Sequence, residues 1–107
     1  MTRQILEDGG WFDVDSATLV DEDTIWDGHN QISRATGTQW DHECLYITRR
    51  GLFVLRRWSQ WEGSGETYQA VSQIDATEWL IRNGVDESSL PGAARELVSL
   101  TAENSEV

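Results

Sequence analysis

The chain contains no lysine. Its eight basic residues are all arginines and stand against 19 aspartates and glutamates, which gives a formal net charge of -11 at pH 7. A negative field of this size repels nucleic-acid phosphates and anionic membranes, and it favours encounters with basic protein surfaces. The sequence therefore predicts no direct nucleic acid binding, no membrane binding, and a protein partner with a basic surface. Adaptation to a salty cytoplasm or a GC-rich genome is an alternative source of the same composition.

Cysteine occurs only once, at Cys44. A single cysteine forms neither an internal disulfide nor a thiolate zinc cluster, which agrees with a reducing compartment. The sequence also lacks an apolar run of about 18 residues, the length that a membrane-spanning helix needs. The opening MTRQILEDGG has neither the basic nor the apolar region of a signal peptide. These features predict a cytoplasmic protein.

The length and the apolar content predict one folded domain. The chain has 107 residues, of which 38% are hydrophobic and six are tryptophan. A chain of this size can bury one modest core. We expect residues 1–100 to form a single domain and residues 101–107 to be a frayed C-terminal tail.

The middle of the chain predicts a three-stranded antiparallel β-meander over about 43–71. CLYIT (44–48) and LFVLRRW (52–58) are rich in β-branched and aromatic residues, and the Arg50-Gly51 pair between them is typical of a two-residue hairpin turn. The glycine-containing EGSGE (62–66) predicts a second turn, and TYQAV (67–71) a third strand.

Helices are predicted after the meander. Ser72 followed by Asp75 is typical of a helix N-terminus, and Gly84 of the residue after a helix end, so we expect a helix over 73–83. A second helix is expected over about 91–100, because proline suits the first helical turn. Residues 10–20 predict one or two short strands, with DSAT as a possible turn. The expected fold class is α+β, with the meander packed against helix 73–83.

The two-residue turn also predicts which side chains share a face of the hairpin. It pairs Ile47 with Val54 and Trp40 with Trp61. Leu45, Ile47 and Val54 are then expected to face Trp79, Leu80 or Ile81 of the helix, and Trp58 lies on the same face. The opposite face carries Trp40, His42, Cys44, Tyr46, Phe53, Leu55, Arg57 and Trp61. A three-residue turn would reassign these faces. Both faces are apolar, so we expect both to be covered.

The stretch 24–46 contains the residues most suited to chemistry. The weak candidates for metal ligands are His29, His42 and Cys44, with the nearby carboxylates of Asp27, Asp41 and Glu43. No second close pair of soft ligands stands opposite them, so we predict no metal and no cofactor. A nucleophilic pair would need His29 to approach Cys44, because His42 is about 6–7 Å from Cys44 along a strand. We predict no catalytic residues and interpret the stretch as a polar contact loop.

Three segments carry a resemblance to other proteins. WDGHNQISRATGTQW, HECLYITRRGLFVLRRWSQWEGSGETY and ATEWLIRNG together resemble a set of small uncharacterised prokaryotic proteins that occur with plasmids, phages or other mobile elements. The resemblance covers about residues 10–84. It implies an accessory protein of a mobile element and supplies no catalytic residue.

These features predict a non-enzymatic acidic interaction protein. We expect it to bind a basic partner, such as a nucleic-acid-handling host protein that it regulates or inhibits. Tryptophan is enriched among the residues that dominate interface energetics. The candidate partner-binding residues are Trp58, Trp61, Asp21, Glu22, Asp23, Asp27 and Asn30. One alternative is a small-ligand or metal-binding module formed by residues 26–44, and another is an enzyme without a recognisable motif.

Overall fold

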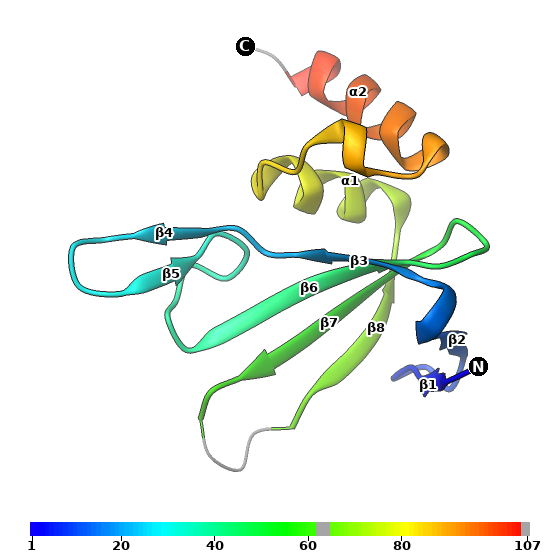
Figure 1. The fold of residues 1–107 in the computed structure, drawn as a ribbon, viewed down its shortest axis with the longest axis horizontal. Coiled ribbons are helices and arrows are strands. Elements are labelled where there is room, and N and C mark those ends of the chain that lie inside the picture. Colours follow the sequence, from blue (N-terminus) through cyan, green and yellow to red (C-terminus); the bar gives the residue numbers. More distant parts are fainter. Residues whose placement is uncertain (62–64, 106–107) are drawn as a thin grey trace.

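The fold is mixed α+β, as the sequence predicts (Figure 1). The computed structural model describes residues 1–61 and 65–105. Its strands are β1 (Arg3–Ile5), β2 (Trp11–Asp13), β3 (Thr18–Asp21), β4 (Thr24–Trp26), β5 (Gln31–Ser33), β6 (Asp41–Ile47), β7 (Phe53–Ser59) and β8 (Thr67–Val71). The helices are α1 (Gln73–Arg82) and α2 (Gly92–Ser105), with single 3-10 turns at Val14–Ser16 and Glu87–Ser89.

The main sheet has four antiparallel strands in the order β3-β6-β7-β8. Strands β6, β7 and β8 follow one another along the chain. Strands β2 and β3 form in and next to residues 10–20, where the sequence predicts one or two short strands, and β3 joins the sheet at the free edge of β6. Two short hairpins, β1-β2 and β4-β5, stand apart from this sheet. The turn expected at EGSGE lies partly outside the described residues, because 62–64 are not among them.

The turn between β6 and β7 differs from the expected one. The amide of Thr48 donates to the carbonyl of Leu52 at 2.8 Å, and the amide of Gly51 donates to the carbonyl of Thr48 at 2.9 Å. The loop therefore has three residues, with Gly51 at a φ of 79° that a side chain would strain. As a result Ile47 pairs with Phe53 rather than with Val54. The predicted register is wrong by one residue.

This register decides which side chains face the helices. Leu45 and Ile47 do contact the helical layer, as predicted, in one buried cluster with Phe53, Leu55, Ala76, Trp79, Leu80, Leu90, Ala94 and Val98. Val54 and Trp58 lie on the opposite face, and Phe53 and Leu55 lie on the helical face, so the prediction placed all four on the wrong side. A shift of one residue moves a strand side chain to the other face because strand side chains alternate.

The opposite face of the sheet is covered by the N-terminal segment. Phe12 is buried there against Cys44, Tyr46 and Val54, and its ring centroid lies 5.2 Å from that of Tyr46. The amide of Glu7 donates to the carbonyl of Tyr68 at 2.9 Å and ties this segment to β8. Both apolar faces are thus packed, and the helices and the N-terminal hairpin lie on different sides (Figure 1).

The α1 boundaries follow from residues visible in the sequence. The Ser72 hydroxyl accepts from the amide of Asp75 at 3.1 Å, which caps the N-terminus. After Asn83 the chain turns at Gly84, with a φ of 62°, and the amide of Val85 donates to the carbonyl of Leu80. The helix α2 continues to Ser105, into the segment expected to be frayed, and residues 106–107 lie outside the described residues.

No helix within the described residues is long and apolar enough to span a lipid bilayer.

Candidate functional site

The stretch interpreted as a polar loop contains a hairpin. Strands β4 and β5 pair from Thr24 with Ser33 to Trp26 with Gln31, and the hairpin projects from the sheet on the side away from β1-β2 (Figure 1). Every residue of β4 is exposed, including Trp26 at 60%. The loop assignment was therefore wrong for these six residues. The exposure of β4 leaves most of the hairpin outside the core, although Ser33 of β5 is buried.

The acidic residues of this hairpin have partners within it. Asp23 forms an ion pair with Arg34, with 2.7 Å between Oδ2 and Nε. The Asp27 carboxylate accepts from the amides of Asn30 at 2.7 Å and His29 at 2.8 Å, and these hydrogen bonds lower its pKa. Asp23 and Asp27 thus shape the hairpin, although both stay exposed.

Glu22 is turned into the protein. Its carboxylate accepts from the Ser33 hydroxyl, from Nδ1 of His42 and, at 3.0 Å, from the amide of Glu43. Only 9% of the Glu22 side chain is exposed. Of the predicted partner-binding acids, Glu22 is therefore the one that faces inward, and it ties the segment between β3 and β4 to β5 and β6.

Ser33, Glu22 and His42 do not form a catalytic triad. In a triad the histidine contacts the nucleophilic hydroxyl, and the carboxylate orients the histidine from its other side. Here the serine hydroxyl and the histidine bind the same carboxylate, and Ser33 is 1% exposed. Nε2 of His42 is buried and has no hydrogen-bond partner among the described residues. The arrangement is a structural clamp.

A second buried carboxylate joins the sheet to α1. The Trp79 indole donates to Oε1 of Glu43 at 3.1 Å, and Nε–H of Arg57 donates to Oε2 at 2.6 Å. The Glu43 side chain is 8% exposed, whereas the Arg57 side chain is 59% exposed. Sequence reasoning considered Glu43 only as a weak metal ligand. An acid opposite an arginine on neighbouring strands predicts an ion pair, but the sequence places Glu43 opposite Arg57 only in the correct register.

A cleft of about 720 Å³ opens beside this carboxylate, between α1 and the sheet. One wall is α1, the floor is formed by β6, β7 and β8, and the loop Ala35–Gly37 closes one end. Its polar and charged lining residues are Thr36, Glu43, Arg57, Gln69, Asp75, Glu78 and Arg82.

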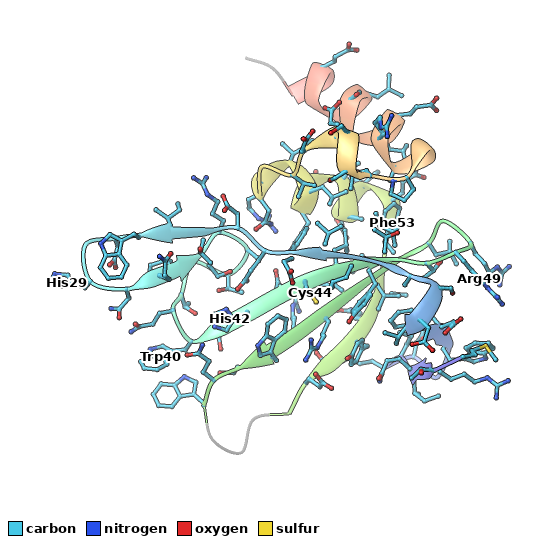
Figure 2. All side chains as sticks on the ribbon, in the orientation of Figure 1. His29, Trp40, His42, Cys44, Arg49 and Phe53 are labelled. Carbon is cyan, nitrogen blue, oxygen red and sulfur yellow. The ribbon has the colours of Figure 1, made fainter. Side chains whose placement is uncertain are left out.

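Two exposed tryptophans pack against each other, with tilted rings, at the end of the sheet. The ring centroids of Trp40 and Trp61 are 4.9 Å apart, and the two residues are 41% and 59% exposed. The amide of Gln60 donates to the carbonyl of Trp40 at 2.8 Å, so the ends of β6 and β7 hold the two rings together. Figure 2 shows Trp40 at the same end of the molecule as His29, which lies at the tip of the β4-β5 hairpin. We call Trp40 and Trp61 the tryptophan pair.

Trp58 lies deeper than Trp61. Its ring stacks on the His42 ring with a centroid distance of 5.6 Å, and the Arg56 guanidinium lies 4.5 Å from its centroid. Arg56 in turn forms a 2.8 Å hydrogen bond to Glu66. These contacts occupy much of Trp58, which leaves the tryptophan pair as the more accessible aromatic surface.

The candidate metal ligands are not brought together. His29 lies at the hairpin tip, whereas Cys44 is 1% exposed on the face covered by the N-terminal segment (Figure 2). Burial raises the pKa of the Cys44 thiol to about 11, which disfavours the thiolate that metals and electrophiles require. Within residues 1–61 and 65–105, no group of three or more His, Cys, Asp or Glu side chains is placed to hold a metal ion.

No protein-family model matches the chain, and no curated protein sequence and no solved structure shows significant similarity to it. The resemblance to mobile-element proteins therefore stays a prediction, and the contacts described above are the basis for a function.

Proposed function

We propose that this protein is a non-enzymatic binding module that docks a basic protein partner on the tryptophan pair and the adjoining acidic surface. The observation that carries the proposal is the close, exposed arrangement of Trp40 and Trp61, whose tilted rings have centroids 4.9 Å apart. Large aromatic rings held rigidly at a surface lose little conformational entropy on binding, and they dominate many interfaces.

Charge supports a basic partner. The net charge of the chain is -11, and the exposed carboxylate of Asp41 directly follows Trp40. Asp41 and Asp21 have no ion-pair partner among the described residues, so both are free to pair with arginine or lysine of another protein. Tryptophan faces also attract such cations. The exposed polar residues Asp23, Asp27 and Asn30 extend the surface along the hairpin.

From the resemblance alone, we further propose that the partner is a host protein that handles nucleic acid, and that the module regulates or inhibits it as an accessory protein of a mobile element. An acidic protein can occupy a basic surface that otherwise binds nucleic acid, because its carboxylates and the phosphates of nucleic acid are both negatively charged. Such a partner also implies a cytoplasmic location.

The test is affinity capture from a lysate of the source organism with the wild-type chain and two tryptophan variants. Trp61→Ala should lose the captured partner, while Trp11→Ala should retain it, because Trp11 is 47% exposed but belongs to the β1-β2 hairpin. The partner should be basic, and it should be released between about 50 and 300 mM salt. Equal capture by both variants, or a partner with an acidic surface, would contradict the proposal.

A further inference from the structure

The cleft beside α1 has polar groups that the fold leaves unused. Asp75, Glu78 and Arg82 line it from α1, and Gln69 lines it from β8. Among the described residues, none of these four side chains has an internal hydrogen-bond or ion-pair partner. All four residues are exposed, and a concave surface that presents several such donors and acceptors is suited to binding another polar chain or ligand.

Arg57 is oriented at this cleft by one hydrogen bond, although its side chain is 59% exposed. Nε–H of Arg57 donates to one oxygen of the buried Glu43 carboxylate, and the Trp79 indole donates to the other oxygen. The guanidinium has no other partner among the described residues and lines the cleft. Because Glu43 balances its charge, Arg57 acts mainly as an oriented donor that suits carbonyl oxygens as well as anions.

The cleft continues toward the tryptophan pair. A second hollow of about 400 Å³ shares Thr36, Glu43 and Arg57 with the cleft, and Asp41 and Ser59 also line it. Asp41 and Ser59 are paired at the end of the sheet and lie next to the residues that support Trp40 and Trp61. The two hollows therefore adjoin at Thr36, Glu43 and Arg57, and the second one lies toward the tryptophan end.

The loop between cleft and tryptophan pair is held in place by its threonines. The Thr36 hydroxyl donates to the carbonyl of Asp41 at 2.7 Å, and the Thr38 hydroxyl accepts from the amide of Asp41 at 2.8 Å. A wall fixed in this way keeps its shape without a ligand, which reduces the ordering cost of binding.

We infer that the cleft binds an extended basic peptide segment of the partner, an inference that rests on the proposed function. Backbone carbonyls of the segment accept from Arg57 and Gln69, and its lysine or arginine side chains pair with Asp75 and Glu78. The charged side chains of the cleft without an ion-pair partner among the described residues are Asp75, Glu78 and Arg82, which sum to one negative charge. The net charge of the whole chain is -11, so electrostatic attraction favours a basic segment over a free anion.

The probe is an acetylated and amidated hexa-arginine peptide, titrated into the full-length ¹⁵N-labelled chain at about 150 mM salt. Tryptophan indole N–H resonances report each site separately, after assignment with single Trp→Phe variants. The Trp79 indole and the Arg57 Nε–H should shift on binding. Glu78→Gln should raise the Kd by up to about fivefold, the upper end of the range for one surface ion pair. Glu96→Gln, an exposed change on α2, is the matched control and should leave the Kd unchanged.

Four results would overturn the inference. Shifts confined to the indoles of Trp40 and Trp61 would leave the proposed function standing and the cleft empty. Equal effects of Glu78→Gln and Glu96→Gln would show attraction to the overall charge only. A hexa-glutamate peptide that shifts Trp79 while hexa-arginine does not would assign an anion site on Arg57 and Arg82. Absence of any shift with hexa-arginine also removes the cleft proposal, and the proposed function is then decided by the capture experiment alone.

Discussion

Glu43 and Arg57 stand directly opposite each other on β6 and β7, and Nε–H of Arg57 donates to Oε2 of Glu43 at 2.6 Å. The same carboxylate receives the Trp79 indole from α1. One buried side chain thus links two strands and a helix, and it orients the arginine that faces the cleft. The stability of the fold and the shape of the proposed binding surface depend on the same contacts.

Trp79→Phe tests the helix side of this link. The variant keeps an aromatic ring in the core but removes the donor to Glu43. An unsatisfied buried acceptor costs about 1–3 kcal/mol, so the free energy of unfolding in urea should fall by that amount. Trp11→Phe is the matched control, because Trp11 is exposed, and it should change the free energy by less than about 0.5 kcal/mol. Equal stability of the two variants would contradict the link.

Glu22→Gln tests the clamp at the base of the hairpin. The amide retains one acceptor oxygen and brings an N–H₂ group toward the donors of Ser33, His42 and Glu43. We expect a loss of about 1–3 kcal/mol in the free energy of unfolding. The neighbouring change Asp21→Asn should cost less than about 0.5 kcal/mol, because Asp21 is exposed. If urea denaturation gave the reverse order, the inward position of Glu22 would be wrong.

Cys44 should not react in the native protein. Its thiol pKa is raised to about 11 by burial, so the thiolate is scarce at pH 8. Native protein mixed with a disulfide reagent should stay unmodified for minutes, and protein unfolded in urea should react at once. The raised pKa also means that the thiol stabilises the fold fully below its ordinary pKa, and that this contribution is lost as pH rises toward about 11. Rapid native labelling would show an open N-terminal face.

Chelation should leave the protein unchanged. No three metal-ligating side chains meet within the described residues. Excess EDTA should therefore not shift the melting temperature, and the purified chain should contain less than one zinc, iron or copper per molecule. A fall of more than about 5 °C would imply a metal contribution of order 1 kcal/mol and would revive the alternative of a metal module at residues 26–44.

The sequence predicted best what depends on local signals. The caps at Ser72 and Gly84 define α1, and the apolar runs around Gly51 define β6 and β7, because each signal acts over a few residues. The register of that hairpin was missed because arginine-glycine suits both two- and three-residue turns. Only the hydrogen bond from Thr48 to Leu52 distinguishes them, and it cannot be read from residue types.

The candidate site was less predictable than the fold. Strand β4 has no buried residue, so it lacks the alternation that marks a strand in a sequence. The contacts of Glu22 with His42 and of Trp79 with Glu43 join residues 20 and 36 positions apart. No periodicity encodes such contacts. The exposed Trp61 was identified from its residue type, and its ring lies near that of Trp40 although the predicted pairing of the two residues was wrong by one position.

The most direct test of a basic partner on the tryptophan pair is a kinetic binding measurement with the captured protein. Association of the wild-type chain should slow about tenfold or more between about 50 and 300 mM salt, because screening weakens electrostatic steering. Trp61→Ala should keep this salt dependence but dissociate faster, while Trp11→Ala should match the wild type. Association that does not change with salt, together with equal dissociation rates for all three chains, would contradict the account.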